Sequence, residues 1–454
     1  MIIIGGGPAG YAAAVRASRL GAKVMLLERE ELGGTCLHRG CIPTKSFLKV
    51  AEVLDTVRKS RRFGVTTGEA TLDFAKMVTY KDQVIKTILS GLQGLMKNNA
   101  IEVVEGSGKL ISKTELRVAI QNGDLSFESD RIILATGSSR AVPPIPGVEG
   151  AGVITTDGIW SLQNKPNSLA IIGAGPSGVE LANIFAILGS KVFLVEMLPQ
   201  IVPTEDREVA DILERCLKRS GIQIFTGTAL QKIEDGENGN KRLTLTNDRG
   251  TTNVNVQMVV ISTGSRPNTQ GLGLEEVGVK VEREAIVTDA RMGTSVPGIW
   301  AAGDVTGGIM LAHVASREGE VAVENALGLS STMDYRAVPA CIYTMPEIGS
   351  VGLSEAAAIE KGYSIRIGRS SMAANNKALI LGERNGLVKI VADVGSDEVL
   401  GIHICGPHAT ELVSEAAACI AQRVTLDELA IMIHAHPTLH EAIREAAQGV
   451  RAGA

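Results

Sequence analysis

Two cysteines, Cys36 and Cys41, stand close together in the stretch GGTCLHRGCIPTK at residues 33–45. On a regular α-helix, residues five positions apart lie about 140° apart around the axis and roughly 7.5 Å apart along it. A disulfide needs Cα atoms within about 7 Å of each other, so a bond between these two residues requires a distorted turn. Because strain makes a disulfide easier to reduce, the pair is a candidate redox-active disulfide.

Metal ligation and two unrelated thiols are the alternatives for this pair. No second Cys or His pair follows at ligand spacing, and His38 is too close in sequence to complete a tetrahedral site. We therefore favour the redox disulfide over both alternatives, which stay open here, and we predict no metal site. The remaining cysteines fall in apolar segments typical of buried, inert thiols; they are Cys216, Cys341, Cys405 and Cys419.

Two glycine motifs of the form GxGxxG indicate dinucleotide binding, GGGPAG at residues 5–10 and GAGPSG at residues 173–178. Each follows an apolar run, at 2–4 and 169–172, that predicts a buried strand. The first glycine allows a tight turn, the second lets the backbone approach a pyrophosphate, and the third lets the helix pack on the strand. In chain order the glycines are Gly5, Gly7 and Gly10, then Gly173, Gly175 and Gly178.

An acidic residue follows each motif at the same spacing. Glu28 and Glu196 both stand 18 residues after the last glycine, where a carboxylate can accept the hydroxyls of a ribose. Glu196 would repel a 2′-phosphate, and no arginine follows it until Arg207, so the second motif predicts NAD rather than NADP. The dithiol comes soon after the first motif and is expected to share that cofactor, a flavin.

Length and charge limit the remaining possibilities. A chain of 454 residues has room for roughly three domains. The formal net charge of −5 argues against a nucleic-acid or membrane-surface partner, and no apolar run reaches the roughly 18 residues of a membrane span. Met1 leads directly into the apolar run, which leaves no room for a signal peptide, so a cytoplasmic location is expected.

The chain resembles the pyridine nucleotide-disulfide oxidoreductases along essentially its whole length. Besides the cysteine box, the resemblance rests on ATG at 135–137, GSRPN at 264–268, PGIWAAGD at 297–304 and HAHPTLHE at 434–441. It implies an α/β fold with two Rossmann-like dinucleotide-binding domains and a C-terminal α+β dimerisation domain. The expected divisions are an FAD-binding part at 1–150, an NAD-binding domain at 151–272, a second FAD-binding part at 273–334 and an interface domain at 335–454.

The resemblance also implies the cofactor contacts. Lys45 is expected beside the flavin and paired with Glu180, while Asp304 should follow a buried strand and reach the FAD. A helix starting near Gly307 should point its N-terminus at the flavin, so His313 contributes through its backbone. The implied FAD contacts are Gly5, Gly7, Gly10, Glu28, Gly34, Thr35, Lys45, Ala135, Thr136, Gly137, Asp304, Leu311, Ala312 and His313, and the implied NAD contacts are Gly173, Gly175, Gly178, Glu196 and Gly264.

The C-terminal box supplies the expected base. By resemblance, His436 of the partner subunit in a homodimer deprotonates the thiol substrate, Glu441 orients it, and the His436–Pro437 peptide is cis. The expected reaction oxidises dihydrolipoamide at Cys36, passes electrons through Cys41 to FAD, and reduces NAD. The expected partners are lipoyl domains of a 2-oxo acid dehydrogenase complex or a glycine cleavage system. His440 departs from the serine more usual at its position.

Other activities of the same family fit the residues less well. Mercuric reductases carry a C-terminal cysteine pair, but no cysteine follows Cys419. Glutathione and trypanothione reductases use NADP, with basic residues where Glu196 stands. An NADH oxidase or diaphorase would not need the pair His436 and Glu441. A purely structural role, docked on an acyltransferase core, is disfavoured by the intact cysteine, base and nucleotide motifs.

Overall fold

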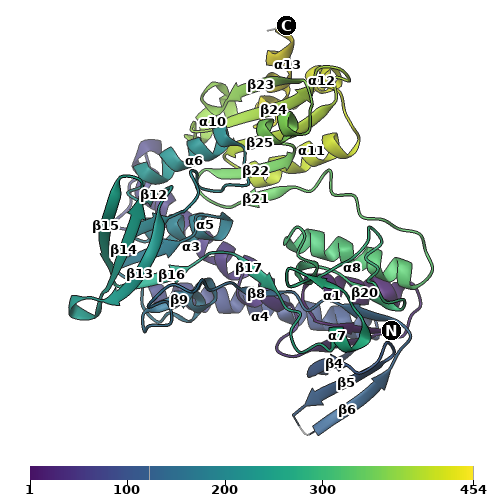
Figure 1. Cartoon of the computed structure of the whole chain (residues 1–454). Helices are drawn as coiled ribbons and strands as arrows, with labels where there is room; N and C mark the ends of the chain where they lie inside the picture. Colours follow the sequence, from purple (N-terminus) through teal and green to yellow (C-terminus); the bar gives the residue numbers. More distant parts are fainter. Residues whose placement is uncertain (122, 453–454) are drawn as a thin grey trace.

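The apolar run at the start of the chain forms the central strand of a parallel five-stranded sheet (Figure 1). The computed structural model describes residues 1–121 and 123–452. Strands covered on both faces must be apolar throughout, and all three isoleucines of β1 are buried. In spatial order the strands are β20 (Ile299–Ala301), β7 (Ile132–Leu134), β1 (Ile2–Ile4), β2 (Met25–Glu28) and β3 (Glu102–Glu105).

Helices and a small antiparallel sheet surround this first sheet. Helix α1 (Pro8–Arg19) begins within the first glycine motif, directly after Gly7, and packs against α8 (Ala312–Ala326). The cysteine box forms α2 (Gly34–His38) and the start of α3 (Cys41–Lys59), which packs against α4 (Phe74–Asn98). The antiparallel sheet contains β4 (Ser107–Leu110), β5 (Glu115–Ile120) and β6 (Gly123–Glu128).

The second glycine motif opens a second parallel sheet of the same kind. Helix α5 (Pro176–Ile187) begins within the motif, directly after Gly175, and α6 (Arg207–Arg219) follows the next strand. The strands in spatial order are β12 (Gln223–Phe225), β11 (Lys191–Val195), β10 (Ser168–Ile172), β16 (Met258–Ile261) and β9 (Val153–Thr155). An antiparallel sheet of β13 (Ala229–Asp235), β14 (Lys241–Asn247) and β15 (Gly250–Val256) packs beside it.

The chain passes between the two parallel sheets on one pair of strands. Strand β8 (Ser138–Arg140) leaves the first sheet and pairs antiparallel with β17 (Ser265–Pro267), on which the chain returns. The proline-rich stretch 142–147 contains neither helix nor strand. The returning segment contains α7 (Leu274–Val277), β18 (Val281–Glu282) and β19 (Ala285–Ile286) before it re-enters the first sheet at β20.

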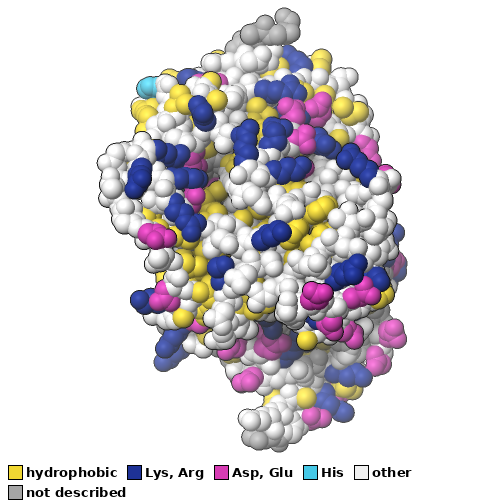
Figure 2. All heavy atoms as spheres, turned by 90° about the vertical axis from the view of Figure 1, so that its left-hand side faces the viewer, with side chains coloured by type: hydrophobic (Ala, Val, Ile, Leu, Met, Phe, Trp, Pro, Cys, Tyr) yellow, Lys and Arg dark blue, Asp and Glu magenta, His cyan; other side chains and the backbone are white. Residues whose placement is uncertain are grey.

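The last part of the chain forms an antiparallel sheet flanked by helices. Its spatial order is β21 (Ala340–Ile342), β22 (Glu347–Gly352), β25 (Val399–Gly406), β24 (Leu387–Asp393) and β23 (Ile365–Ser371). Its helices are α9 (Glu355–Glu360), α10 (Asn376–Leu381), α11 (Ala409–Ala421), α12 (Leu426–Ile431) and α13 (Glu441–Ala452). This sheet meets the second parallel domain at α6, and Figure 2 shows the side of the molecule on which that helix lies.

A buried lysine joins this sheet to α6. The ammonium of Lys389, on β24, lies 3.0 Å from both carboxylate oxygens of Asp206, which caps α6. A carboxylate oxygen of Glu355 lies 2.6 Å from the same ammonium. Lys389 and Asp206 are both almost fully buried, so the Asp206 carboxylate depends on this ammonium for compensation, whereas Lys389 is compensated by Glu355 as well.

The predicted fold class is confirmed, with one local correction. The helix expected from Gly307 begins five residues later, at Ala312. Residues Asp304–Thr306 form a separate short 3₁₀-helix that ends at Gly307, whose φ of 70° is left-handed and cannot continue a right-handed helix. In the described ranges, no helix is both long and apolar enough to cross a membrane.

Candidate active site

A break between two helices brings the cysteines of the box together. Cys36 lies in α2 and Cys41 is the first residue of α3, while Arg39 and Gly40 between them leave the helical conformation. The indole N–H of Trp160 donates to the Arg39 carbonyl at 2.8 Å and anchors the break. The distorted turn that the spacing requires is therefore present. Both cysteines are free thiols here, so the disulfide itself stays a prediction.

The two thiols differ in acidity because they interact with each other. This interaction lowers the pKa of Cys41 and raises that of Cys36. The ammonium of Lys45 lowers the pKa of Cys41 further, whereas burial opposes ionisation of both sulfurs. In the reduced pair, Cys41 is consequently the more acidic sulfur.

The cysteine box is tied directly to the first glycine motif. The Gly33 N–H donates to the Gly6 carbonyl at 2.8 Å. A Cβ on Gly34 would lie 2.8 Å from the Gly7 Cα, so only glycine permits this approach. The dithiol therefore stands beside the first nucleotide-binding loop, where the sequence predicted it.

The two glycine motifs repeat the same geometry. The first glycine of each has a left-handed φ, 108° at Gly5 and 100° at Gly173. A Cβ on the third glycine would lie 1.7 Å from the Gly5 carbonyl oxygen in the first motif and 2.0 Å from the Gly173 oxygen in the second. The second glycine is open: a Cβ on Gly175 would meet no atom within 4 Å. No side chain caps α1 or α5, which leaves their first N–H groups available to a pyrophosphate.

Each acidic residue holds its own glycine loop. Glu28 accepts the Gly6 N–H at 2.7 Å, and Glu196 accepts the Ala174 N–H at 2.8 Å. The second oxygen of Glu196 accepts the Leu198 N–H at 2.9 Å. A carboxylate oxygen can accept two hydrogen bonds, so both acids retain capacity for a ribose hydroxyl. The sequence did not reveal this second, structural role.

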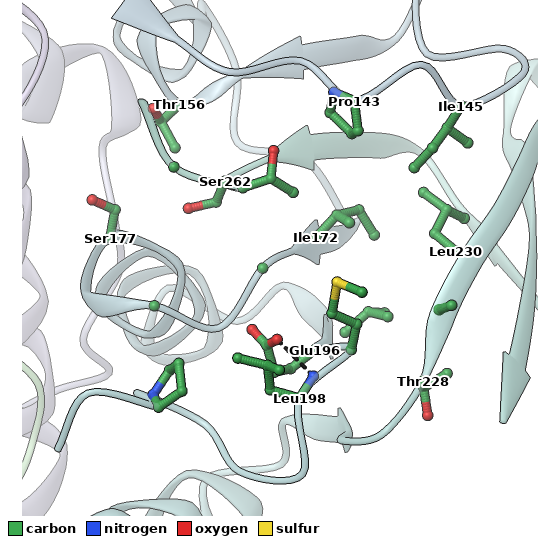
Figure 3. Close-up of a pocket in the computed structure, with 18 of the residues that line it drawn as sticks. Pro143, Ile145, Thr156, Ile172, Ser177, Glu196, Leu198, Thr228, Leu230 and Ser262 are labelled. Atoms are coloured by element: carbon green, nitrogen blue, oxygen red, sulfur yellow. Dashed lines mark hydrogen bonds between the residues drawn. The ribbon is translucent and has the colours of Figure 1, made fainter. Parts of the chain in front are cut away.

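A cavity of 620 Å³ lies over the second motif (Figure 3). Glu196 points into it from the end of β11, and the apolar side chains of Ile172, Leu198 and Leu230 form its walls. Gly175 and Gly264, both predicted contacts, line the same cavity. An apolar cavity with one carboxylate and an uncapped helix fits an adenosine with its ribose and pyrophosphate.

Lys45 and Glu180 form an ion pair between α3 and α5. The Lys45 ammonium lies 2.9 Å and 3.0 Å from the two carboxylate oxygens of Glu180. The backbone N–H of Tyr343 donates to the same carboxylate at 2.9 Å, and its ring lies 4.4 Å from the ammonium. Tyr343 was not identified from the sequence, because no motif marks a residue that contributes through its backbone.

Asp304 lies just beyond β20, on the first parallel sheet. The hydroxyl of Ser138 donates to its carboxylate at 2.6 Å. The turn before it is fixed by buried Glu318, which accepts the Gly303 N–H and the Tyr335 hydroxyl, each at 2.7 Å. Burial raises the pKa of Glu318. Neither Ser138 nor Glu318 was predicted, since their relation to Asp304 depends on packing.

Two further segments that carry predicted FAD contacts are residues 135–137 and the start of α8. The Thr136 hydroxyl donates to the Asn268 carbonyl at 2.7 Å, so the motifs at 135–137 and 264–268 meet. The N-terminus of α8, which starts after Leu311, has no side-chain cap. A ring nitrogen of His313 lies 2.9 Å from the Pro339 carbonyl oxygen, which leaves only its backbone near the helix start.

His436 and Glu441 lie together at the start of α13. A carboxylate oxygen of Glu441 is 2.9 Å from Nδ1 of His436, and the other accepts the Thr438 N–H at 2.9 Å. Both bonds lower the pKa of Glu441, and the bond from the Thr438 N–H has the larger effect. Glu441 therefore stays ionised beside the imidazole. The His436–Pro437 peptide is cis, as predicted. His436 is 62 % exposed, and among the described residues no hydrogen bond or ion pair links it to the cysteine box.

The two neighbouring histidines share another acid. Nε2 of His434 lies 2.7 Å from one carboxylate oxygen of Glu415 on α11, and Nε2 of His440 lies 3.7 Å from the other. Glu415 was missed because it lies in an alanine-rich helix with no recognisable motif. Within the described ranges, no three His, Cys, Asp or Glu residues are grouped so as to hold a metal ion.

Three of the four remaining cysteines are buried, as expected of inert thiols; these are Cys216, Cys405 and Cys419. The fourth, Cys341, is only partly buried, and burial raises its pKa to about 11.

Comparison with known proteins agrees with this arrangement. The family described as pyridine nucleotide-disulphide oxidoreductase matches residues 1–319, and its dimerisation domain matches residues 338–447. A dihydrolipoyl dehydrogenase from Bacillus subtilis (strain 168) is 39 % identical over 98 % of this chain and 97 % of its own length. One from Thermus scotoductus is 38 % identical over 99 % and 97 %.

Solved structures extend the comparison. LpdA from Mycobacterium tuberculosis has a TM-score of 0.91 at 28 % identity, with 98 % of each chain covered. The HOCl-induced flavoprotein disulfide reductase RclA from Escherichia coli, as its Cu(II) complex, has a TM-score of 0.87 at 29 % identity with the same coverage. This chain belongs to the pyridine nucleotide-disulphide oxidoreductase family, with FAD-binding and NAD-binding domains followed by a dimerisation domain.

Proposed function

We propose that this chain oxidises a dihydrolipoyl group to its cyclic disulfide and reduces NAD⁺ to NADH. The observation that carries the proposal is the pair His436 and Glu441, an exposed imidazole held by an ionised carboxylate. A thiol substrate needs such a base because the thiolate is the nucleophile. Transfer between a flavin and NADH alone does not need one. The relatives named dihydrolipoyl dehydrogenase support the same choice.

The cofactors follow from the two glycine loops. FAD would be held by the first loop, Glu28, Thr136, Asp304 and the N-terminus of α8, and NAD by the second loop, Glu196 and Gly264. When bound, FAD accepts the electron pair of the reduced dithiol and delivers it to NAD⁺ as a hydride equivalent. Lys45, held by Glu180, would favour negative charge beside the flavin and on Cys41.

The thiol chemistry can be written with the chain's own residues. His436 takes the proton of one substrate thiol, and the resulting thiolate attacks Cys36 in the oxidised pair. The Cys36–Cys41 bond breaks and Cys41 leaves as a thiolate, which agrees with its lowered pKa. The sulfur of the second substrate thiol then attacks the substrate sulfur of the mixed disulfide, and the cyclic disulfide departs. The proton of this second thiol passes to the departing Cys36 sulfur, while the first proton stays on His436.

The base would act across a two-fold dimer. His436 has no bond to the cysteine box of its own chain among the described residues, and its side chain is exposed. A symmetric dimer could present it to the partner's Cys36. We also propose the domain divisions at residues 150, 272 and 334, a lipoyl domain of a 2-oxo acid dehydrogenase complex or glycine cleavage system as partner, and the cytoplasm as location.

The test is a direct assay of the purified, FAD-loaded protein. Dihydrolipoamide with NAD⁺ should yield NADH, whereas glutathione disulfide and mercuric ion should not be reduced at a comparable rate with NADH or NADPH. The proposal would be overturned if the protein reduced glutathione disulfide rapidly and did not oxidise dihydrolipoamide.

A further inference from the structure

A second cavity lies between α6 and the ends of β23 and β24. Its volume is 320 Å³, and it shares no lining residue with the nucleotide cavity. Three arginines contribute to its walls: Arg215 and Arg219 from the last turns of α6, and Arg384 from the loop before β24. Figure 2 shows Lys and Arg side chains gathered on the side of the molecule that carries α6.

These arginines have no acidic partners. In the part of the chain that the structure describes, no ion pair or hydrogen bond is made by the guanidinium of Arg215, Arg219 or Arg384, and no lining residue of the cavity is acidic. Other basic residues of the same helix are paired: Arg207 lies 2.9 Å from Asp211, and Lys218 contacts Glu214. The three arginines are exposed, so water, and no acidic side chain of the described residues, surrounds their charges.

The helix dipole explains only part of this arrangement. Cations in the last turn of a helix are favoured by its negative end, which accounts for Arg219. Arg384 lies on the loop before β24, three residues after the end of α10, so helix ends alone do not explain why arginines from two separate elements converge on one cavity. Ser371 and Asn385 add a hydroxyl and an amide to the same cavity, both able to donate to an anion.

We propose that this cavity binds a small phosphate-bearing anion. A guanidinium group offers two parallel N–H donors that match the oxygens of a phosphate, and several such groups around one space favour more than one negative charge. The volume lies at the lower end of the range for small-molecule sites. A bound anion would bridge α6 and the last sheet, and would therefore stabilise the contact between two domains.

The test is calorimetric titration of the FAD-loaded protein with inorganic pyrophosphate. Saturating NAD⁺ keeps the nucleotide cavity occupied, and sodium chloride keeps the ionic strength constant. We expect one saturable site per chain, and a pyrophosphate-dependent rise in melting temperature. Citrate should bind at least about ten-fold more weakly, because its carboxylates do not reproduce the phosphate geometry.

Single substitutions distinguish the cavity from general surface charge. Arg384→Ala and Arg219→Ala should each weaken pyrophosphate binding about ten-fold and remove most of the thermal shift. Arg207→Ala, on the same helix but paired with Asp211, is the matched control and should bind like the unmodified protein. Arg384→Lys should bind pyrophosphate with intermediate affinity, since it keeps the positive charge and loses the two parallel N–H donors of the guanidinium.

The proposal would be overturned by no saturable binding, by equal binding in Arg384→Ala, or by an equal loss in Arg207→Ala. Citrate binding as tight as pyrophosphate would refute the phosphate assignment. The titration needs no dihydrolipoamide turnover, so it stands or falls separately from the proposed function. FAD content and dihydrolipoamide oxidation should be unchanged in Arg384→Ala, which excludes misfolding as the cause of lost binding.

Discussion

Lys45 and Glu180 lie 135 positions apart, yet both oxygens of the Glu180 carboxylate accept hydrogen bonds from the Lys45 ammonium. The carboxylate is almost fully buried, with 5 % of the side chain exposed, so it depends on this cation for compensation. The pair joins the helix of the cysteine box to the first helix of the NAD-binding domain. The pair thereby fixes the Lys45 ammonium near Cys41, and this positive charge lowers the pKa of Cys41.

Replacing Lys45 should change when Cys41 ionises. In a Cys36→Ser background, Lys45→Met should raise the pKa of Cys41, because the nearby cation that favours the thiolate is gone. The thiolate signal, read as a long-wavelength charge-transfer band with oxidised FAD, should then disappear at a higher pH as the solution is acidified. Lys49→Met is the control, since Lys49 pairs with Glu52 on the exposed side of the same helix. Equal midpoints for both variants would contradict the prediction.

The two cysteines should differ when replaced one at a time. Cys36→Ser leaves Cys41, the more acidic sulfur, and should show the charge-transfer band at neutral pH. Cys41→Ser leaves Cys36 without this thiolate and should not show it. Absorption spectra of the purified, FAD-loaded variants make the measurement. A band in the Cys41 variant alone would reverse the assignment of the two sulfurs.

His436→Gln should slow oxidation of dihydrolipoamide by on the order of a hundred- to ten-thousand-fold. FAD binding and electron transfer from NADH to a dye should stay largely intact, because only the thiol half-reaction needs a base. Glu441→Gln should have a milder effect, since Glu441 orients the imidazole without contacting substrate. Stopped-flow measurement of the two half-reactions separates them. Equal losses in both half-reactions would argue against a base role.

Mixing two inactive variants tests whether the site is shared between subunits. Cys36→Ser subunits and His436→Gln subunits should recover activity after exchange, because heterodimers regain one complete site. Subunit exchange is followed by mass spectrometry of differently tagged chains. No recovery despite proven exchange, or full activity in a monomer, would refute the shared site.

The second acidic residue should determine the nicotinamide cofactor. The kcat/KM for NAD should exceed that for NADP, and Glu196→Gln should reduce the ratio roughly ten-fold, since the repulsion of a 2′-phosphate is removed. Glu28→Gln is the matched control: Glu28 holds the first glycine loop in the same way, and its loss should leave the ratio unchanged. Equal kcat/KM values for NAD and NADP in the unmodified protein would contradict this interpretation of Glu196.

The contact between α6 and the last sheet should depend on one buried cation. Lys389→Met should lower the free energy of unfolding by about 3–5 kcal/mol, because buried Asp206 would lose its partner. Lys218→Met, which removes an exposed pair with Glu214 on the same helix, should cost about 0.5 kcal/mol or less. Urea unfolding of the FAD-loaded protein measures both, and similar midpoints for the two variants would disprove the role of Lys389.

Part of the site could be predicted from the sequence because its geometry depends on residues close together along the chain. A glycine motif between a buried strand and a helix dictates its own turn. A disulfide between Cys36 and Cys41 would require a distorted turn, and a break is found at Gly40. The acids Glu28 and Glu196 were predictable for the same reason, since each follows its motif within one βαβ unit. Pairs such as Lys45 with Glu180 were expected only through the family resemblance.

The tertiary structure decided what depends on distant packing. Tyr343 and Glu318 contact the site from other segments, and Glu415 on α11 contacts two histidines that precede α13. Arg384 faces α6 only because two domains pack together. No local pattern encodes these neighbours, because their proximity results from how whole elements pack. The amino-acid sequence by itself therefore determined which reactive and cofactor-binding residues are present. The packing of the domains determined which charged and polar side chains lie next to them.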